Sequence, residues 1–96
     1  MNHDSRPSAD LLESVHPFPG TYQIRAIGAA SNDFAGRVVA AVEAEVATPS
    51  ELDHSTRFTP NRRHVSVTID VTVQSANQVR AIYARIQTVE GLTLLL

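Results

Sequence analysis

Apolar and polar residues alternate strictly over residues 65–73, and this is the clearest pattern along the chain. Five Val or Ile residues take the odd positions, and the even positions hold Ser66, Thr68, Asp70 and Thr72. A period of two predicts a β-strand with one face packed against a core and the other face in solvent. Such a strand belongs to an antiparallel sheet, because strands of parallel sheets are usually buried on both faces.

Three further strands and two helices are predicted from similar patterns. Alternation over residues 21–27 predicts a first strand, mixed character over 52–59 is typical of an edge strand, and the apolar segment 92–96 predicts a last strand. Apolar residues three or four positions apart predict a helix over residues 34–46. A second helix is predicted after the capping residue Ser75, with an apolar stripe made of Val79, Ile82, Tyr83 and Ile86.

The order of these elements is strand, helix, strand, strand, helix, strand. This order predicts an α+β, ferredoxin-like fold, in which two helices cover one face of a four-stranded antiparallel sheet. Residues 17–96 are expected to form that single domain. Residues 1–16 are assigned to a flexible N-terminal tail, because residues 1–9 have no periodicity and Pro17 and Pro19 limit residues 10–15 to a short helical turn.

Composition narrows the classes of function. The formal net charge is −2 and all eight basic residues are Arg, so the large basic surface typical of nucleic-acid binding is missing. The absence of cysteine excludes disulfides and zinc–thiolate sites. No apolar run approaches the roughly 18 residues of a membrane span, and the N-terminus is polar, so a cytoplasmic location with no membrane contact is expected.

A first candidate site lies where the first strand leads into the first helix. Free amides at a helix start favour anions, so the expected ligand is a small carboxylate or an amino acid. The candidate ligand-binding residues are Arg25, Gly28, Ser31, Asn32 and Asp33. The alternative is structural, with Gly28 permitting the turn and Ser31 or Asn32 capping the helix.

A second candidate site surrounds the predicted hairpin between residues 52–59 and 65–73. Clustered arginines bind phosphate or carboxylate through charge-assisted hydrogen bonds. The candidate anion-binding residues are Arg57, Arg62, Arg63 and His64. The alternative is a solvated turn, whose positive field Glu51 and Asp53 would reduce.

Neither a metal site nor a cofactor site is expected. Of the four histidines, His3 and His16 lie in or beside the predicted tail. A turn centred on Pro60-Asn61 would place His54 opposite Val67 and His64 opposite Arg57, so these two rings would not face one another. Two imidazoles without a third ligand also make a poor metal site.

Catalysis and RNA binding are not expected either. The segment 28–36 does not match the phosphate-cradling loop of acylphosphatases, and the chain has no Gly-x-Ser-x-Gly nucleophile motif. Single-stranded RNA is bound on this fold by aromatic residues of the open sheet face. The strand over residues 65–73 offers Ser, Thr and Asp there instead.

Several segments resemble the YbeD-like family of small uncharacterised bacterial proteins. They are Leu11-Leu12-Glu13, Pro17-Phe18-Pro19, residues 22–28, residues 65–69 and residues 78–83. The resemblance covers residues 10–96 and implies an ACT-like form of the ferredoxin-like fold. It implies no catalytic residues, and the family's association with lipoate metabolism rests on gene neighbourhood. Residues 60–64 depart from the family pattern, which tends to have a Gly and an aromatic residue there.

These observations favour a non-catalytic regulatory or protein-interaction domain. The uncovered sheet face and the two sheet edges suggest a homo-oligomer or another protein partner. The alternative is a sensor that binds an amino acid or another small carboxylate at residues 28–33.

Overall fold

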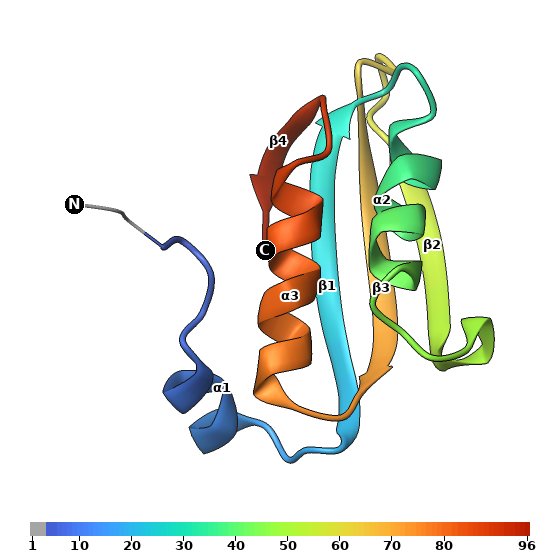
Figure 1. The fold of residues 1–96 in the computed structure, drawn as a ribbon. Helices are drawn as coiled ribbons and strands as arrows, with labels where there is room; N and C mark the ends of the chain where they lie inside the picture. The colour runs from blue at the N-terminus through green and yellow to red at the C-terminus, as the bar shows by residue number, and fades with distance from the viewer. Residues whose placement is uncertain (1–3) are drawn as a thin grey trace.

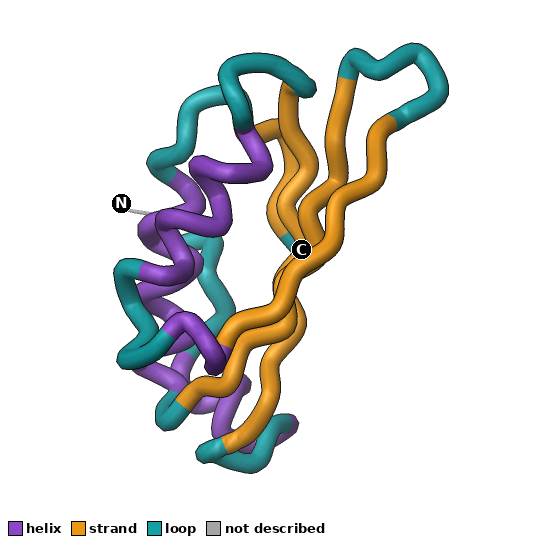
Figure 2. Tube along the Cα trace, turned by 90° about the vertical axis from the view of Figure 1, so that its right-hand side faces the viewer, coloured by secondary structure: helices purple, strands orange, loops and turns teal. Residues whose placement is uncertain are grey.

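The computed structural model describes residues 4–96, which form two layers (Figures 1 and 2). The elements in chain order are α1 (Ala9–Val15), β1 (Gly20–Ala29), α2 (Phe34–Glu43), a short 3₁₀ helix (Pro49–Glu51), β2 (Leu52–Phe58), β3 (His64–Val73), α3 (Ala76–Gln87) and β4 (Leu92–Leu95). The sheet has the order β2-β3-β1-β4, and each neighbouring pair is antiparallel. The predicted ferredoxin-like α+β fold is therefore confirmed, with α1 as an additional helix.

The helices lie on one side of the sheet, and the other side is left uncovered (Figure 2). The odd residues of β3, from Val65 to Val73, are all buried under the helices. Ile24 and Ala26 of β1 join them, together with the apolar stripes of α2 and α3. The alternation read from residues 65–73 thus decides which face of the sheet belongs to the core.

The hairpin between β2 and β3 has a longer turn than the one predicted. Phe58 pairs with Val65, and His54 pairs with Ile69 rather than with Val67. His64 lies beyond the end of β2 and faces Ala29 of β1, not Arg57. The predicted register was wrong because the turn spans residues 60–63: the Arg62 amide bonds the Thr59 carbonyl at 2.8 Å, and Arg62 adopts a left-handed φ of 57°.

Helix α2 ends at Glu43, three residues before the predicted end. After the C-cap Ala44, the amides of Glu45 and Val46 donate to the carbonyls three residues earlier, at 2.9 and 3.3 Å. These bonds tighten the chain into turns, so it leaves the helical path. The predicted cap of α3 is confirmed, because Ser75 Oγ accepts a hydrogen bond from the Gln78 amide at 3.1 Å.

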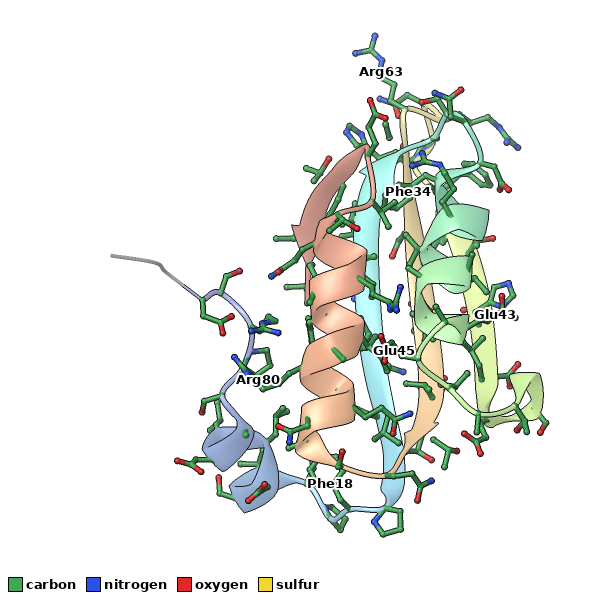
Figure 3. All side chains as sticks on the ribbon, in the orientation of Figure 1. Phe18, Phe34, Glu43, Glu45, Arg63 and Arg80 are labelled. Carbon is green, nitrogen blue, oxygen red and sulfur yellow. The ribbon has the colours of Figure 1, made fainter. Side chains whose placement is uncertain are left out.

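The N-terminal segment differs from the flexible tail assigned to residues 1–16, of which residues 1–3 lie outside the described part. Ser8 caps α1, which packs against α3, and Leu12 is buried with 2% of its surface exposed. The Arg80 guanidinium on α3 donates to the Pro7 carbonyl at 3.0 Å and pairs with Asp4. In Figure 3, Arg80 points from α3 toward this segment. One buried leucine and one arginine are too local a signal for periodicity to detect.

Candidate functional site

Three loops meet at the upper end of the sheet in Figure 1. They are the β1–α2 loop (residues 30–33), the hairpin turn (residues 60–63) and the α3–β4 turn (residues 88–91). The Ala30 amide donates to the Arg63 carbonyl at 2.9 Å, and the Ala29 amide donates to the Gly91 carbonyl at 3.0 Å. The first candidate site and part of the second are therefore neighbours.

The β1–α2 loop enters its helix through two left-handed residues. Asn32 and Asp33 have φ values of 53° and 51°. Asp33 is the N-cap of α2, and its Oδ1 accepts a hydrogen bond from the Gly36 amide at 3.2 Å. The N-cap of α2 is thus Asp33 rather than Ser31 or Asn32. The hydrogen bond to the Gly36 amide occupies one oxygen of the Asp33 carboxylate.

Arg37 holds two of the three loops together. Its Nε donates to the Asn32 carbonyl and its Nη1 donates to the Glu90 carbonyl, both at 2.8 Å. The guanidinium carbon also lies 5.9 Å from the centre of the Phe34 ring. Among residues 4–96, Nη2 of Arg37 has no protein acceptor within hydrogen-bond distance. A cleft of about 400 Å³ opens beside this group, lined by Ser31, Asn32, Arg37, Glu90 and Gly91.

Arg37 is absent from both sets of candidate residues predicted from the sequence, so its role was missed. One signal was present in the sequence. Arg37 follows the cap by four residues, and a cation at a helix N-terminus opposes the helix dipole. A positive charge at that place therefore needs compensation, which the carbonyls of Asn32 and Glu90 supply.

Three residues of the first candidate set do not line the cleft: Asp33, which caps α2, and also Gly28 and Arg25. Gly28 is inside β1, where a Cβ atom would come within 2.5 Å of the Phe34 ring and 2.6 Å of the Gly91 oxygen. Gly28 therefore allows Phe34 to pack against the backbone; the labelled Phe34 lies between the start of α2 and the sheet in Figure 3. Arg25 lies opposite Thr68 in the sheet, and its side chain is on the uncovered face.

The second candidate set does not converge on one point. Arg57 lies opposite Ser66 on the uncovered face. Arg62 instead covers the Phe58 ring, with its guanidinium carbon 5.2 Å from the ring centre. Arg63 projects from the tip of the hairpin, away from the rest of the molecule (Figure 3). His64 is exposed at the start of β3.

On the uncovered sheet face, acidic and basic residues lie toward opposite ends of the strands. At one end, Asp53 of β2 faces Asp70 of β3, and both line a shallow depression of about 420 Å³ together with Glu51. Gln23 donates to Asp70 at 3.0 Å. Toward the other end of the same face lie the exposed side chains of Arg57 and Arg25, with the apolar residues Ile27, Leu94 and Leu96 beside them.

The histidines remain separate from one another. The His16 ring stacks edge-on against Tyr22 at 4.8 Å between ring centres, and His54 faces Ile69. His3 lies outside the described residues. Within residues 4–96, no three His, Asp or Glu side chains come close enough together to hold a metal ion.

Tyr83 is the titratable group that burial affects most clearly. Burial raises the pKa of Tyr83 above its ordinary range, and the hydroxyl of Tyr22, 3.2 Å away, adds to the shift. The two hydroxyls bond each other, and the Tyr22 ring also contacts His16 at the end of α1. This pair is accordingly part of the packing of the N-terminal segment.

Within the described part of the chain, no helix combines the length and the apolar character that crossing a bilayer requires.

Comparisons with known proteins point to one family. A family described as "Protein of unknown function (DUF493)" matches residues 13–96. The chain is 35% identical to a UPF0250 protein of Shewanella woodyi and 33% identical to one of Shewanella sediminis, in each case over 80 residues that cover 83% of this chain and 89% of the relative. Its fold is similar to the solution structure of protein HP0495 from H. pylori, with a TM-score of 0.60, 14% identity and 98% coverage of both chains.

Proposed function

The chain belongs to the DUF493 family, the YbeD-like family of small bacterial proteins of unknown function, and on that footing we propose that it is a non-catalytic regulatory or protein-interaction domain. The interaction surface is the uncovered face of the sheet. The observation that carries this proposal is that, among residues 4–96, no helix covers one face of the four-stranded sheet, and acidic and basic side chains lie toward opposite ends of that face (Figure 2).

The loop residues support a binding role more than a chemical one. Asp33 already holds the Gly36 amide, and Arg37 already holds two carbonyl groups. A general base or an electrophile must instead be free to approach a reacting atom. These polar groups stabilise the loops that join the strands, so none of them is free to act as a general base or an electrophile.

Photo-crosslinking from two positions tests this proposal. Thr68 lies on a central strand of the uncovered face, whereas Glu13 is exposed on α1. A photoreactive amino acid is placed at either position in the cells that produce the protein naturally. Protein adducts from position 68 and not from position 13 are expected. Equal labelling from both positions, or none from position 68, would overturn the proposal.

The Arg37 cleft favours a second candidate function, a sensor of an amino acid or another small carboxylate. Arg37 and the polar residues Ser31 and Asn32 line the cleft, and a carboxylate is a good acceptor for a guanidinium. A ligand at 100 times its Kd stabilises the native state by about 2.7 kcal/mol, which raises Tm by roughly 10–20 °C for a domain of this size.

Thermal unfolding with amino acids and short mono- and dicarboxylates at millimolar concentration tests the sensor. A rise in Tm with one ligand class is expected, and it should be absent in the Ser31→Ala variant if the hydroxyl contacts the ligand. No shift with any carboxylate would rule out this second function and would leave the interaction proposal in place.

A further inference from the structure

We infer that a second copy of the chain covers the uncovered sheet face, with the strands of the two sheets running in opposite directions. This inference rests on the proposed function and names the partner at the same surface. Its basis is the arrangement of charge along the face, which is complementary to itself after a two-fold rotation.

The charges separate along the strand direction. On β2, Asp53 and Arg57 both face outward, four residues and about 13 Å apart along the strand. On the central strands, Asp70 pairs with Gln23, and Arg25 lies two residues further along β1. Glu51 adds a third carboxylate at the acidic end. One end of the face is therefore acidic, and the opposite half carries two arginines.

The direction of the two-fold axis decides whether these charges attract or repel. An axis along the strands would place the acidic end of one protomer on the acidic end of its partner. An axis across the strands, at the level of Ile24 and Ile69, places each acidic end on a basic half. Arg57 then lies over Glu51 of the other copy, and Arg25 lies beside Asp70 of the other copy. Opposite charges across an interface select this orientation.

The area of the face sets the expected strength of the dimer. Seven residues along a strand by four strands make roughly 23 Å by 15–19 Å, or about 400 Å² per protomer. The total of about 800 Å² is below the roughly 1,200–2,000 Å² of a stable interface. Apolar contact is limited to Ile27, Leu94 and Leu96, of which Leu94 is 47% and Leu96 is 56% exposed in the single chain. A concentration-dependent dimer is therefore expected, with a Kd of roughly micromolar or weaker.

Paired charge reversals test the arrangement. The basic variant carries Asp53→Arg with Asp70→Arg, and the acidic variant carries Arg25→Glu with Arg57→Glu. Sedimentation equilibrium is measured from about 10 µM to 1 mM. The wild-type chain should form dimers, and each variant alone should dimerise at least about tenfold more weakly. An equimolar mixture of the two variants should restore dimers, because the basic face of one variant then meets the acidic face of the other.

A matched control separates local charge from net charge. The Asp10→Arg and Glu13→Arg variant makes the same change in net charge as the basic variant, but on exposed residues of α1. It should dimerise like the wild-type chain. Far-UV circular dichroism checks that each variant is folded.

The inference is overturned by a wild-type chain that stays monomeric throughout, by variants that dimerise normally, or by a mixture that stays monomeric. If the wild-type chain is monomeric but a photoreactive amino acid at position 68 still crosslinks to another protein, the dimer is refuted and the proposed function stands. A monomer without such crosslinks would refute both.

Discussion

Truncation of Leu12 tests whether the N-terminal helix is part of the folded domain. Leu12 lies on α1 with 2% of its surface exposed, and its side chain belongs to the single core cluster. The neighbouring Leu11 lies on the same helix with 54% of its surface exposed. The pair Leu12→Ala and Leu11→Ala therefore makes the same chemical change at a buried and an exposed position of one helix.

The expected cost follows from burial and position. Replacing a core leucine by alanine costs about 2.7–5 kcal/mol, and less where neighbouring groups can move into the space. Because α1 is short and packs at the margin of the helix layer, we expect about 2–3 kcal/mol for Leu12→Ala. For Leu11→Ala we expect less than about 0.5 kcal/mol, as alanine is a good helix former and little buried surface is lost.

Urea unfolding followed by far-UV circular dichroism measures both variants. A loss of about 2–3 kcal/mol lowers the urea midpoint by about 1–2 M for a domain of this size. Low protein concentration keeps self-association out of the measurement. If Leu12→Ala and Leu11→Ala unfold at the same midpoint, α1 does not contribute to the core and residues 1–16 are the flexible tail that the sequence suggested.

Three further outcomes are expected. Gly28→Ala should lower stability by at least about 2 kcal/mol in urea unfolding, because the new methyl group would overlap the Phe34 ring. Asp53→Asn should raise Tm by about 1–2 °C at low salt, since it relieves repulsion from the facing Asp70. Hydrogen bonds from arginine, mainly Arg6, lower the pKa of Asp4, so its carboxylate stabilises the fold above about pH 4 and loses this effect as the pH falls further. In the Asp4→Asn variant, the free energy of unfolding should therefore decrease less than in the wild-type chain as the pH is lowered.

A specific experimental result would contradict each of these three predictions. A Gly28→Ala variant as stable as the wild-type chain would mean that Phe34 does not pack against the backbone there. A Tm rise for Asp53→Asn that persists in about 1 M salt would exclude charge repulsion as its cause. Asp4→Asn curves that parallel the wild-type curves between about pH 5 and pH 2 would mean that this carboxylate is not held by arginine in solution.

The fold could be predicted because its strongest signals are local. The alternation over residues 65–73 requires one buried and one exposed face, and the stripe ending at Ile86 requires a helix on the buried side. The edge position predicted for residues 52–59 is confirmed by the strand order. The ends of the elements and the register of the strands were harder to predict from the sequence. One left-handed residue, Arg62, lengthens the hairpin turn and shifts every residue pair between β2 and β3.

The sequence could predict which loops carry the candidate sites, but not the role of each residue in them. The residues of 28–33 and 57–64 do come to neighbouring places, joined by the bond from Ala30 to Arg63. Their individual roles depended on neighbours distant in sequence. Position 28 must be Gly because the Phe34 ring packs against its backbone. The Arg37 side chain is held by a hydrogen bond to the carbonyl of Glu90, 53 residues away along the chain.

By itself, the sequence determined the class of fold, the buried face of the sheet and the cap of α3, because each depends on residues a few positions apart. Only the tertiary structure decided that Leu12 docks an N-terminal helix, that Arg37 joins two loops, and that acidic and basic residues separate along the uncovered face. These features arise where strands and loops distant in the chain lie side by side. The contacts between these residues, and the separation of their charges, depend on the register of the sheet.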